Sequence, residues 1–158
     1  SYVLARRARW GIETHDRDTG GRGMLRSLKR GALLGVLIDQ QTRVDSVWVP
    51  FLGREALTPS GPARLALRIG IPMVPMTITM RPDGNHVLQI GPKIAMRMAS
   101  PGADEGEYEE LIRENTRRCN DALGRMILAS KEQWVWFHPR WREGQELSSG
   151  SGMDIAYS

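Results

Sequence analysis

Apolar residues recur at helical spacing in four segments of the chain. The longest is 104–131, where apolar side chains return every three or four positions and acidic residues crowd the first turn. The basic stretch 2–9 is compatible with a helix, and 24–30 has a short apolar side. A fourth helix is predicted to start at Thr58, as its cap, and to stop at Gly70.

Continuous apolar runs and one turn signal predict the strands. Residues 33–38 form an apolar run that ends at polar Asp39, a pattern typical of a strand buried on both faces of a parallel sheet. Residues 47–51 form a second candidate strand, and 73–80 and 87–90 flank Pro-Asp-Gly-Asn, a hairpin signal. Strands that alternate with helices predict an α/β fold with a mixed, largely parallel sheet flanked by helices.

Length and charge place these elements in one globular domain with a basic pole. The 158 residues are 41% hydrophobic and 25% charged. Residues 1–30 carry eight basic and three acidic side chains, whereas 103–158 carry seven basic and eleven acidic ones. The basic pole suits phosphate, an acidic lipid or an acidic protein, and a solvated face explains it equally well. The Ser/Gly-rich tail, 143–158, is predicted to be disordered.

The single cysteine and the C-terminal tryptophans are interpreted first as core residues. Cys119 falls on the apolar stripe of the longest helix, which predicts a buried thiol in a reducing compartment. Trp134, Trp136 and Trp141 fit core packing better than a membrane-interface belt. No apolar run reaches the roughly 18 residues of a spanning helix, so we expect any membrane contact of this stretch to be at the surface.

Two kinds of polar residue are candidates for a binding site. Asp39 and Gln40 end the most apolar strand candidate, and ligands gather at the carboxyl ends of strands in open α/β sheets. A strand-terminal turn is the alternative. Arginine suits phosphate because its planar fork makes paired hydrogen bonds. Arg22, Arg26 and Arg30 recur four apart and would form a stripe for carrier or membrane docking, or simply face solvent.

Five segments in order resemble those of the bacterial lipid A late acyltransferases, relatives of the glycerolipid acyltransferases. That family has a strand ending in D-Q, then V-x-V-P-F-F-G, T-x-x-G-x-A, P-x-V-P and a closing Q-W-x-W-x-H-x-R-W. The corresponding segments here are Asp39-Gln40, Val47 to Gly53, Thr58 to Ala63, Ile71 to Pro75, and Gln133 to Trp141. The resemblance covers about residues 2–142, taken as the C-terminal part of an acyltransferase domain.

The resemblance implies a mechanism and a site. In this family the histidine of an H-x4-D/E dyad acts as general base on an acceptor hydroxyl, which attacks the thioester of an acylated carrier protein. We expect that dyad before Ser1, so no catalytic residue is assigned in this chain. The substrate-binding residues that the resemblance and the strand-end argument suggest are Asp39, Gln40, Arg43, Thr58 and Gly61.

The three histidines differ in whether a carboxylate follows at the spacing of the dyad. Glycines stand five positions after His15 and His86, so neither fits. His138 and Glu143 satisfy H-x4-E, but they lie in the closing segment and not ahead of Asp39, so we do not interpret them as the dyad. His15 is expected to be solvated in a polar loop, and His86 is expected to be a turn residue.

The resemblance also implies partners and a location. The donor would be acyl carrier protein and the acceptor a lipid A precursor, at the cytoplasmic face of the bacterial inner membrane. The protein would be peripheral there or held by an anchor before Ser1. No metal and no cofactor are implied. Alternative acceptors are mannosylated phosphatidylinositol and lysophosphatidic acid. A non-catalytic lipid- or carrier-binding module is the alternative from another class, and no nucleic-acid motif is present.

Overall fold

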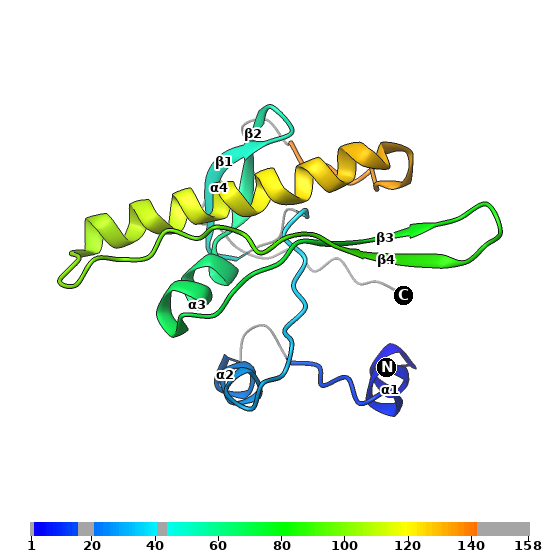
Figure 1. Ribbon diagram of the computed structural model, residues 1–158, viewed down its shortest axis with the longest axis horizontal. Coiled ribbons are helices and arrows are strands. Elements are labelled where there is room, and N and C mark those ends of the chain that lie inside the picture. Colours follow the sequence, from blue (N-terminus) through cyan, green and yellow to red (C-terminus); the bar gives the residue numbers. More distant parts are fainter. Residues whose placement is uncertain (1, 16–20, 41–43, 142–158) are drawn as a thin grey trace, which may run out of the picture. The chain divides into compact units, whose positions relative to one another are not determined.

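The computed structural model describes residues 2–15, 21–40 and 44–141, which form parts of two compact units, 1–37 and 38–158. Figure 1 shows the helices and strands of each unit. Arg43 and the tail predicted to be disordered lie outside the described residues.

The N-terminal unit contains two short helices close to the predicted positions. They are α1 (Tyr2–Arg9) and α2 (Gly21–Lys29). Gly31 follows α2 with a φ of 83°, a left-handed conformation that glycine adopts without a steric cost and that ends a helix. Arg22, Arg26 and Arg30 are all exposed, as the predicted stripe requires, but Arg30 lies one residue beyond the helix.

The predicted strand at 33–38 is not formed in this structure. Residues 32–38 have no regular secondary structure, and Leu33 and Leu37 are 98% and 73% exposed. A strand buried on both faces needs hydrogen-bonded neighbours and covering layers on each side. This segment has neither among the described residues, so its apolar pattern alone does not produce a strand.

The second unit combines two hairpins with two helices and a short 3-10 turn. Both hairpins are antiparallel pairs, and no parallel pairing occurs among the described residues, so a largely parallel sheet is not shown. The elements are β1 (Ser46–Phe51), β2 (Arg54–Pro59), α3 (Gly61–Ile69), β3 (Met76–Met80), β4 (His86–Ile90), α4 (Glu105–Ala129) and the 3-10 helix Lys131–Gln133. His86 begins β4, where the sequence predicted a turn residue.

The start of α3 corrects the sequence-based prediction. Thr58 is not a helix cap, because it lies in strand β2 and pairs with Val47 of strand β1. Strand β2 was not predicted from the sequence. Ser60 is the residue before α3, and Pro62 occupies the first turn, where its missing N–H costs no hydrogen bond. Gly70 ends the helix in a left-handed conformation, as predicted.

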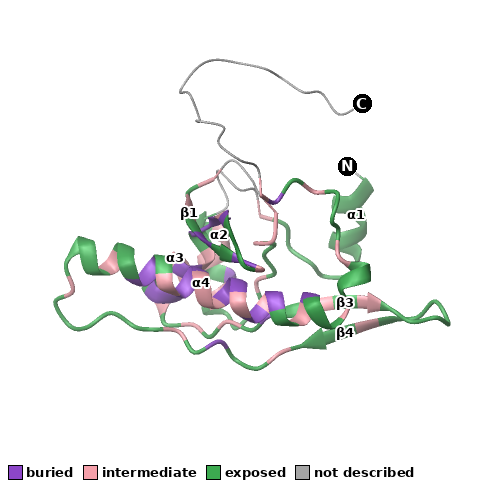
Figure 2. Cartoon of the chain, turned by 90° about the horizontal axis from the view of Figure 1, so that it is seen from above, coloured by how far each residue is buried: buried purple, intermediate pink, exposed green. Residues whose placement is uncertain are grey.

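Helix α4 is the central packing element of the second unit (Figure 2). It begins at its cap Asp104, whose carboxylate accepts from the Glu107 backbone N–H at 2.8 Å. Its buried face contacts β1, α3 and β3. Buried Ile127, Ile112 and Cys119 each belong to a different one of three core clusters, so the predicted apolar stripe is confirmed. None of the helices described is both long and apolar enough to cross a membrane.

Polar side chains fasten the other elements to α4 and to the turn after it. Arg64 of α3 donates two hydrogen bonds to the Glu109 carboxylate, at 2.6 and 2.8 Å. The Asn115 amide bonds both backbone groups of Arg97 at 2.8 Å. Gln133 bonds both backbone groups of Met80, the last residue of β3. Because each amide satisfies a backbone donor and an acceptor together, these contacts fix where the connecting segments lie.

The ion pairs of Glu114 predict a pH dependence of stability. Hydrogen bonds from Arg117, and then Arg118, lower the pKa of Glu114 from 4.5 to about 2, and its side chain is 19% exposed. The resulting stabilisation is present above pH 4.5 and is lost as the pH falls towards 2. We expect Glu114→Gln to cost about 1–2 kcal/mol at pH 7, since both arginines are partly exposed.

Urea unfolding at several pH values measures this effect. The difference between the wild type and Glu114→Gln should shrink between pH 4.5 and 2. Glu110→Gln, an exposed carboxylate on the same helix, should stay within about 0.5 kcal/mol of the wild type throughout. A Glu114→Gln difference that does not change with pH would contradict the assignment.

Candidate functional site

Asp39 is held by a tryptophan that lies 95 positions later in the chain. Its half-buried carboxylate accepts a hydrogen bond from the Trp134 indole N–H at 3.0 Å. Ile38, the residue before it, packs with Met73 against the core cluster of Cys119. Asp39 is therefore held in place by the hydrogen bond to its carboxylate and by the packing of the preceding residue, Ile38.

An aromatic cluster fixes the orientation of the Trp134 ring. Phe51, Trp136 and Trp141 have ring centroids 5.7, 4.7 and 5.9 Å from it, in tilted or edge-to-face arrangements. Trp134 and Trp141 pack against the core cluster of Phe51, which confirms core packing for these two tryptophans. Trp136 packs edge-to-face against Trp134 but is 48% exposed, so the prediction of core packing does not hold for it.

Beside this cluster lies a buried polar network centred on the Thr58 hydroxyl. Arg140 is 1% exposed and donates to the Leu57 carbonyl at 2.7 Å and to Thr58 Oγ1 at 2.6 Å. Asn120 Nδ2 donates to the same hydroxyl and to the Pro50 carbonyl, both at 3.0 Å. Thr58 in turn donates to the Ala56 carbonyl, so its hydroxyl uses its full capacity of one donated and two accepted bonds.

Arg140 carries a buried charge beside the Asp39 site. Burial lowers the pKa of Arg140 to about 10, and the negative charge of Asp39 opposes that shift. The guanidinium is therefore still protonated at neutral pH, and it also lies over the Phe51 ring, 4.8 Å from the centroid. Arg140 Nε and Asn120 Oδ1 are buried without a hydrogen-bond partner among the described residues.

The structure brings together only part of the predicted substrate-binding set. Asp39 and Gln40 are half-buried neighbours, and Gln40 makes no hydrogen bond to any described residue. Thr58 is 0% exposed, and its hydroxyl contacts Arg140 and Asn120 rather than the surface. Gly61 is exposed at the start of α3.

A substitution at Gly61 tests whether a glycine is required at this position for the stability of the fold. A Cβ added there would meet no atom within 4 Å, and its φ is not in the left-handed region. Gly61→Ala should therefore leave the thermal unfolding temperature unchanged or raise it, since alanine favours a helix over glycine by up to about 1 kcal/mol. Calorimetry measures this. A marked loss of stability would show that the glycine is structurally required.

A second cluster, in the N-terminal unit, was not predicted from the sequence. The buried Ser27 hydroxyl donates to Glu13 Oε2 at 2.7 Å and lies 3.5 Å from His15 Nε2. Arg30 donates to Glu13 Oε1 at 3.1 Å. The His15 side chain is only 19% exposed, so the expectation that it is solvated is wrong. A Cβ on Gly23 would lie 2.8 Å from its ring, so Gly23 makes room for the imidazole.

Sequence reasoning missed Trp134, Arg140 and Asn120 as neighbours of the site. Trp134 and Arg140 belong to the closing Trp-rich segment, whose indole and guanidinium donors could have suggested buried acceptors. Asn120 had a weaker signal, a polar residue on the buried side of the longest helix. The partners of all three lie 62 or more positions away, a separation that a single sequence does not reveal.

The fold and site define an α/β chain in which the Asp39 carboxylate is held by a C-terminal Trp-rich segment. The family model described as bacterial lipid A biosynthesis acyltransferase matches residues 1–143, nearly the whole chain. The chain belongs to that family, as its resemblance predicted. A comparison with curated proteins gives no significant match.

Proposed function

We propose that the protein moves a fatty acyl chain from acyl carrier protein to a hydroxyl of a lipid A precursor. Family membership supports an acyltransferase of lipid A biosynthesis in general. The observation that carries the proposal for this chain is the hydrogen bond from Trp134 to Asp39, because it joins the D-Q segment to the closing Trp-rich segment. Two motifs of the family thus converge on one carboxylate.

In the proposed reaction, the acceptor hydroxyl oxygen attacks the carbonyl carbon of the carrier thioester. A new C–O bond forms and the C–S bond breaks. The hydroxyl proton passes to a histidine general base and then to the departing thiolate, so the products are an ester and the carrier thiol. We propose that this histidine belongs to an H-x4-D/E dyad outside the 158 residues, since His15 and His86 lack the spacing and His138 lies in the closing segment.

We assign Asp39 and Gln40 to organising the acceptor. One oxygen of this half-buried carboxylate is held by Trp134, and the second, which bonds to none of the described residues, would accept from a sugar hydroxyl. Gln40 adds an amide with both donor and acceptor capacity. Arg140, which donates to Thr58 Oγ1 at 2.6 Å, places a positive charge near the Asp39 carboxylate. Gly61 and Arg43 remain proposed contributors to substrate binding.

We propose that Arg22, Arg26 and Arg30 dock the acidic carrier protein or an anionic membrane at the cytoplasmic face of the inner membrane. Arg22 and Arg26 are exposed, whereas Arg30 also pairs with Glu13 at 3.1 Å. Charge steering acts mainly on association rates and is screened by salt. Replacing all three with Gln should raise the Michaelis constant for one anionic substrate, or weaken vesicle binding, while sparing the maximal rate. An unchanged response at low ionic strength would show a merely solvated face.

An acyl-transfer assay tests the proposed function. The active enzyme should transfer acyl groups from an acyl carrier protein thioester to a lipid A precursor, in preference to lysophosphatidic acid or mannosylated phosphatidylinositol. The 158-residue chain alone should give background turnover only, because its one H-x4-E match, His138 and Glu143, lies in the closing segment and not ahead of Asp39. Turnover by this chain that His138→Ala abolishes would overturn our interpretation of the dyad.

A further inference from the structure

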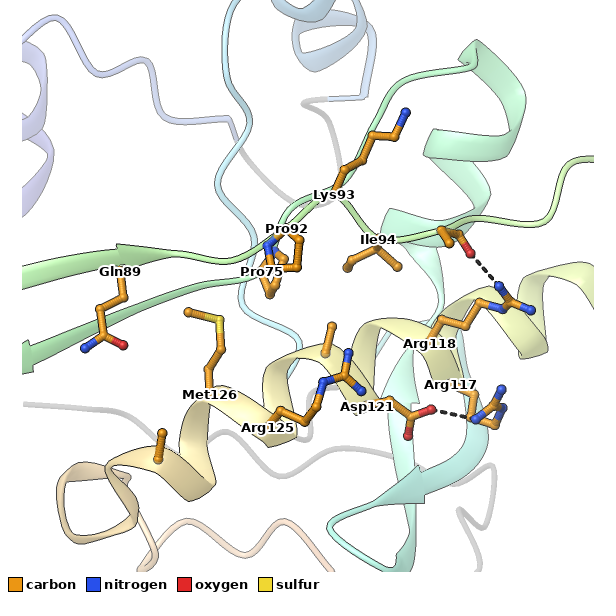
Figure 3. Close-up of a pocket in the computed structure, with 13 residues that line it drawn as sticks. Pro75, Gln89, Pro92, Lys93, Ile94, Arg117, Arg118, Asp121, Arg125 and Met126 are labelled. Atoms are coloured by element: carbon orange, nitrogen blue, oxygen red, sulfur yellow. Dashed lines mark hydrogen bonds and ion pairs between the residues drawn. The ribbon is translucent and has the colours of Figure 1, made fainter.

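A cavity of about 590 Å³ lies between helix α4 and the base of the β3–β4 hairpin. Its floor and walls are mainly apolar, and Figure 3 shows Pro75, Pro92 and Ile94 facing Met126 across it. We call this cavity the α4 groove. A volume of this size is within the range of small-molecule sites. None of the residues assigned to the acyl-transfer site lines it.

The helix side of the α4 groove consists of two rows of side chains four positions apart. One row contains Arg117, Asp121 and Arg125. The other contains Arg118, Ala122 and Met126. Cationic side chains thus lie along the edge of a surface whose centre consists of the apolar groups of Ala122 and Met126. The flexible methionine side chain adapts its shape to irregular apolar ligands.

The charges along the edge of the groove are not balanced within the described residues. Arg117 is bound to Glu114 and Asp121, and Arg118 to Glu114 and the Ala95 carbonyl. Arg125 is exposed and makes no hydrogen bond or ion pair to any described residue. Figure 3 shows its guanidinium on the groove side of α4, whereas the Lys93 side chain points away. Arg125 is therefore the cation that an incoming anion would meet.

These features define the chemistry of a ligand. A small hydrophilic anion would bury no apolar surface on the floor of the groove, and a neutral hydrocarbon would form no ion pair with the Arg125 guanidinium. A ligand with an acyl chain and a phosphate satisfies both. We propose that the α4 groove binds an anionic phospholipid of the bilayer, with an acyl chain along Ile94 and Met126 and the phosphate on Arg125. This proposal does not rest on the proposed acyl transfer, since none of the groove residues is assigned to that reaction.

Methyl NMR on the full chain tests the proposal with dihexanoylphosphatidic acid, used as monomers. With the methionine methyl groups labelled with ¹³C, the Met126 signal should shift saturably, whereas that of Met98, 55% exposed and outside the groove, should not move. Dihexanoylphosphatidylcholine should bind about tenfold more weakly. Inorganic phosphate at the same concentration should not displace the lipid.

Two pairs of variants distinguish specific binding in the α4 groove from unspecific charge attraction to the surface. Arg125→Glu should raise the apparent Kd about tenfold, whereas Arg68→Glu, the same change at an exposed position on α3, should alter it less than about twofold. Ala129→Trp should fill one end of the groove and weaken binding to the same extent. Leu128→Trp, its exposed neighbour outside the groove, should have little effect. All four positions are exposed, so the fold should be retained.

Several outcomes would overturn the proposal. Equal weakening by Arg125→Glu and Arg68→Glu would show unspecific charge attraction, and full displacement by inorganic phosphate would show a simple anion site. Undiminished binding to Ala129→Trp would show that the groove is not occupied. The readout is lipid binding, so failure here leaves the acyl-transfer assay unaffected, and the reverse also holds.

Discussion

Replacing Arg140 with alanine is expected to lower the free energy of unfolding by about 3–5 kcal/mol. Thr58 Oγ1 and the Leu57 carbonyl each lose the hydrogen bond from Arg140, although Thr58 Oγ1 still accepts from Asn120. A cavity also opens against Phe51, whose ring the guanidinium covers at 4.8 Å. Urea unfolding followed by tryptophan fluorescence measures this change, because the aromatic cluster is adjacent.

Two further variants separate the contributions. Arg140→Met keeps most of the volume and removes the buried charge, so it should cost less than Arg140→Ala. Arg125→Ala, an exposed arginine of α4, should cost less than about 0.5 kcal/mol. An Arg140→Ala protein within about 1 kcal/mol of the wild type would show that the Arg140 contacts are energetically minor.

Replacing Asp39 with alanine in the active enzyme is expected to reduce acyl transfer at least about 100-fold. The stability cost should be only about 1 kcal/mol, because the change removes a single partly buried hydrogen bond, from Trp134 at 3.0 Å. Asp39→Asn keeps an acceptor for Trp134 but loses the charge, so it tests whether the charge is what matters. Activity per folded molecule and the melting temperature are the measurements.

Asp45→Ala and Trp134→Phe complete that experiment. Asp45 is an exposed carboxylate six positions along the chain and should have little effect on activity. Trp134→Phe keeps an aromatic ring and removes the indole donor, so its activity should lie between those of the wild type and Asp39→Ala. A variant of Asp39 that melts several degrees lower but keeps near-normal activity would make it a structural turn residue.

Local patterns predicted the elements whose stability is local. Helix α4 and the β3–β4 hairpin follow from periodicity and turn residues. Strand β2 was missed because its burial comes from pairing with β1 and from Arg140, 82 positions from Thr58. The apolar run 33–38 failed as a strand prediction for the opposite reason. A correct pattern forms a strand only where other strands are available to pair with it.

The sequence predicted Asp39 as a site residue but not the side chains that contact it. Asp39 was predicted because polar residues at strand ends form binding edges in open α/β sheets, although its strand is not formed. The donors around it come from the Trp-rich segment, and the resemblance identified that segment without showing what its side chains contact. Long-range hydrogen bonds such as Trp134 to Asp39 depend on the tertiary fold, which periodicity does not encode.

The reactivity of Cys119 can report on local unfolding around helix α4. It is the single cysteine, 3% exposed, and burial raises the pKa of its thiol to about 11. Thiol reagents attack the thiolate, so the folded chain should react very slowly at neutral pH. Alkylation then requires α4 to separate from Ile38, Met73 and Ile94. When reclosing is faster than the chemical step, the labelling rate measures the free energy of that opening. Comparing it with global unfolding would show whether α4 detaches independently.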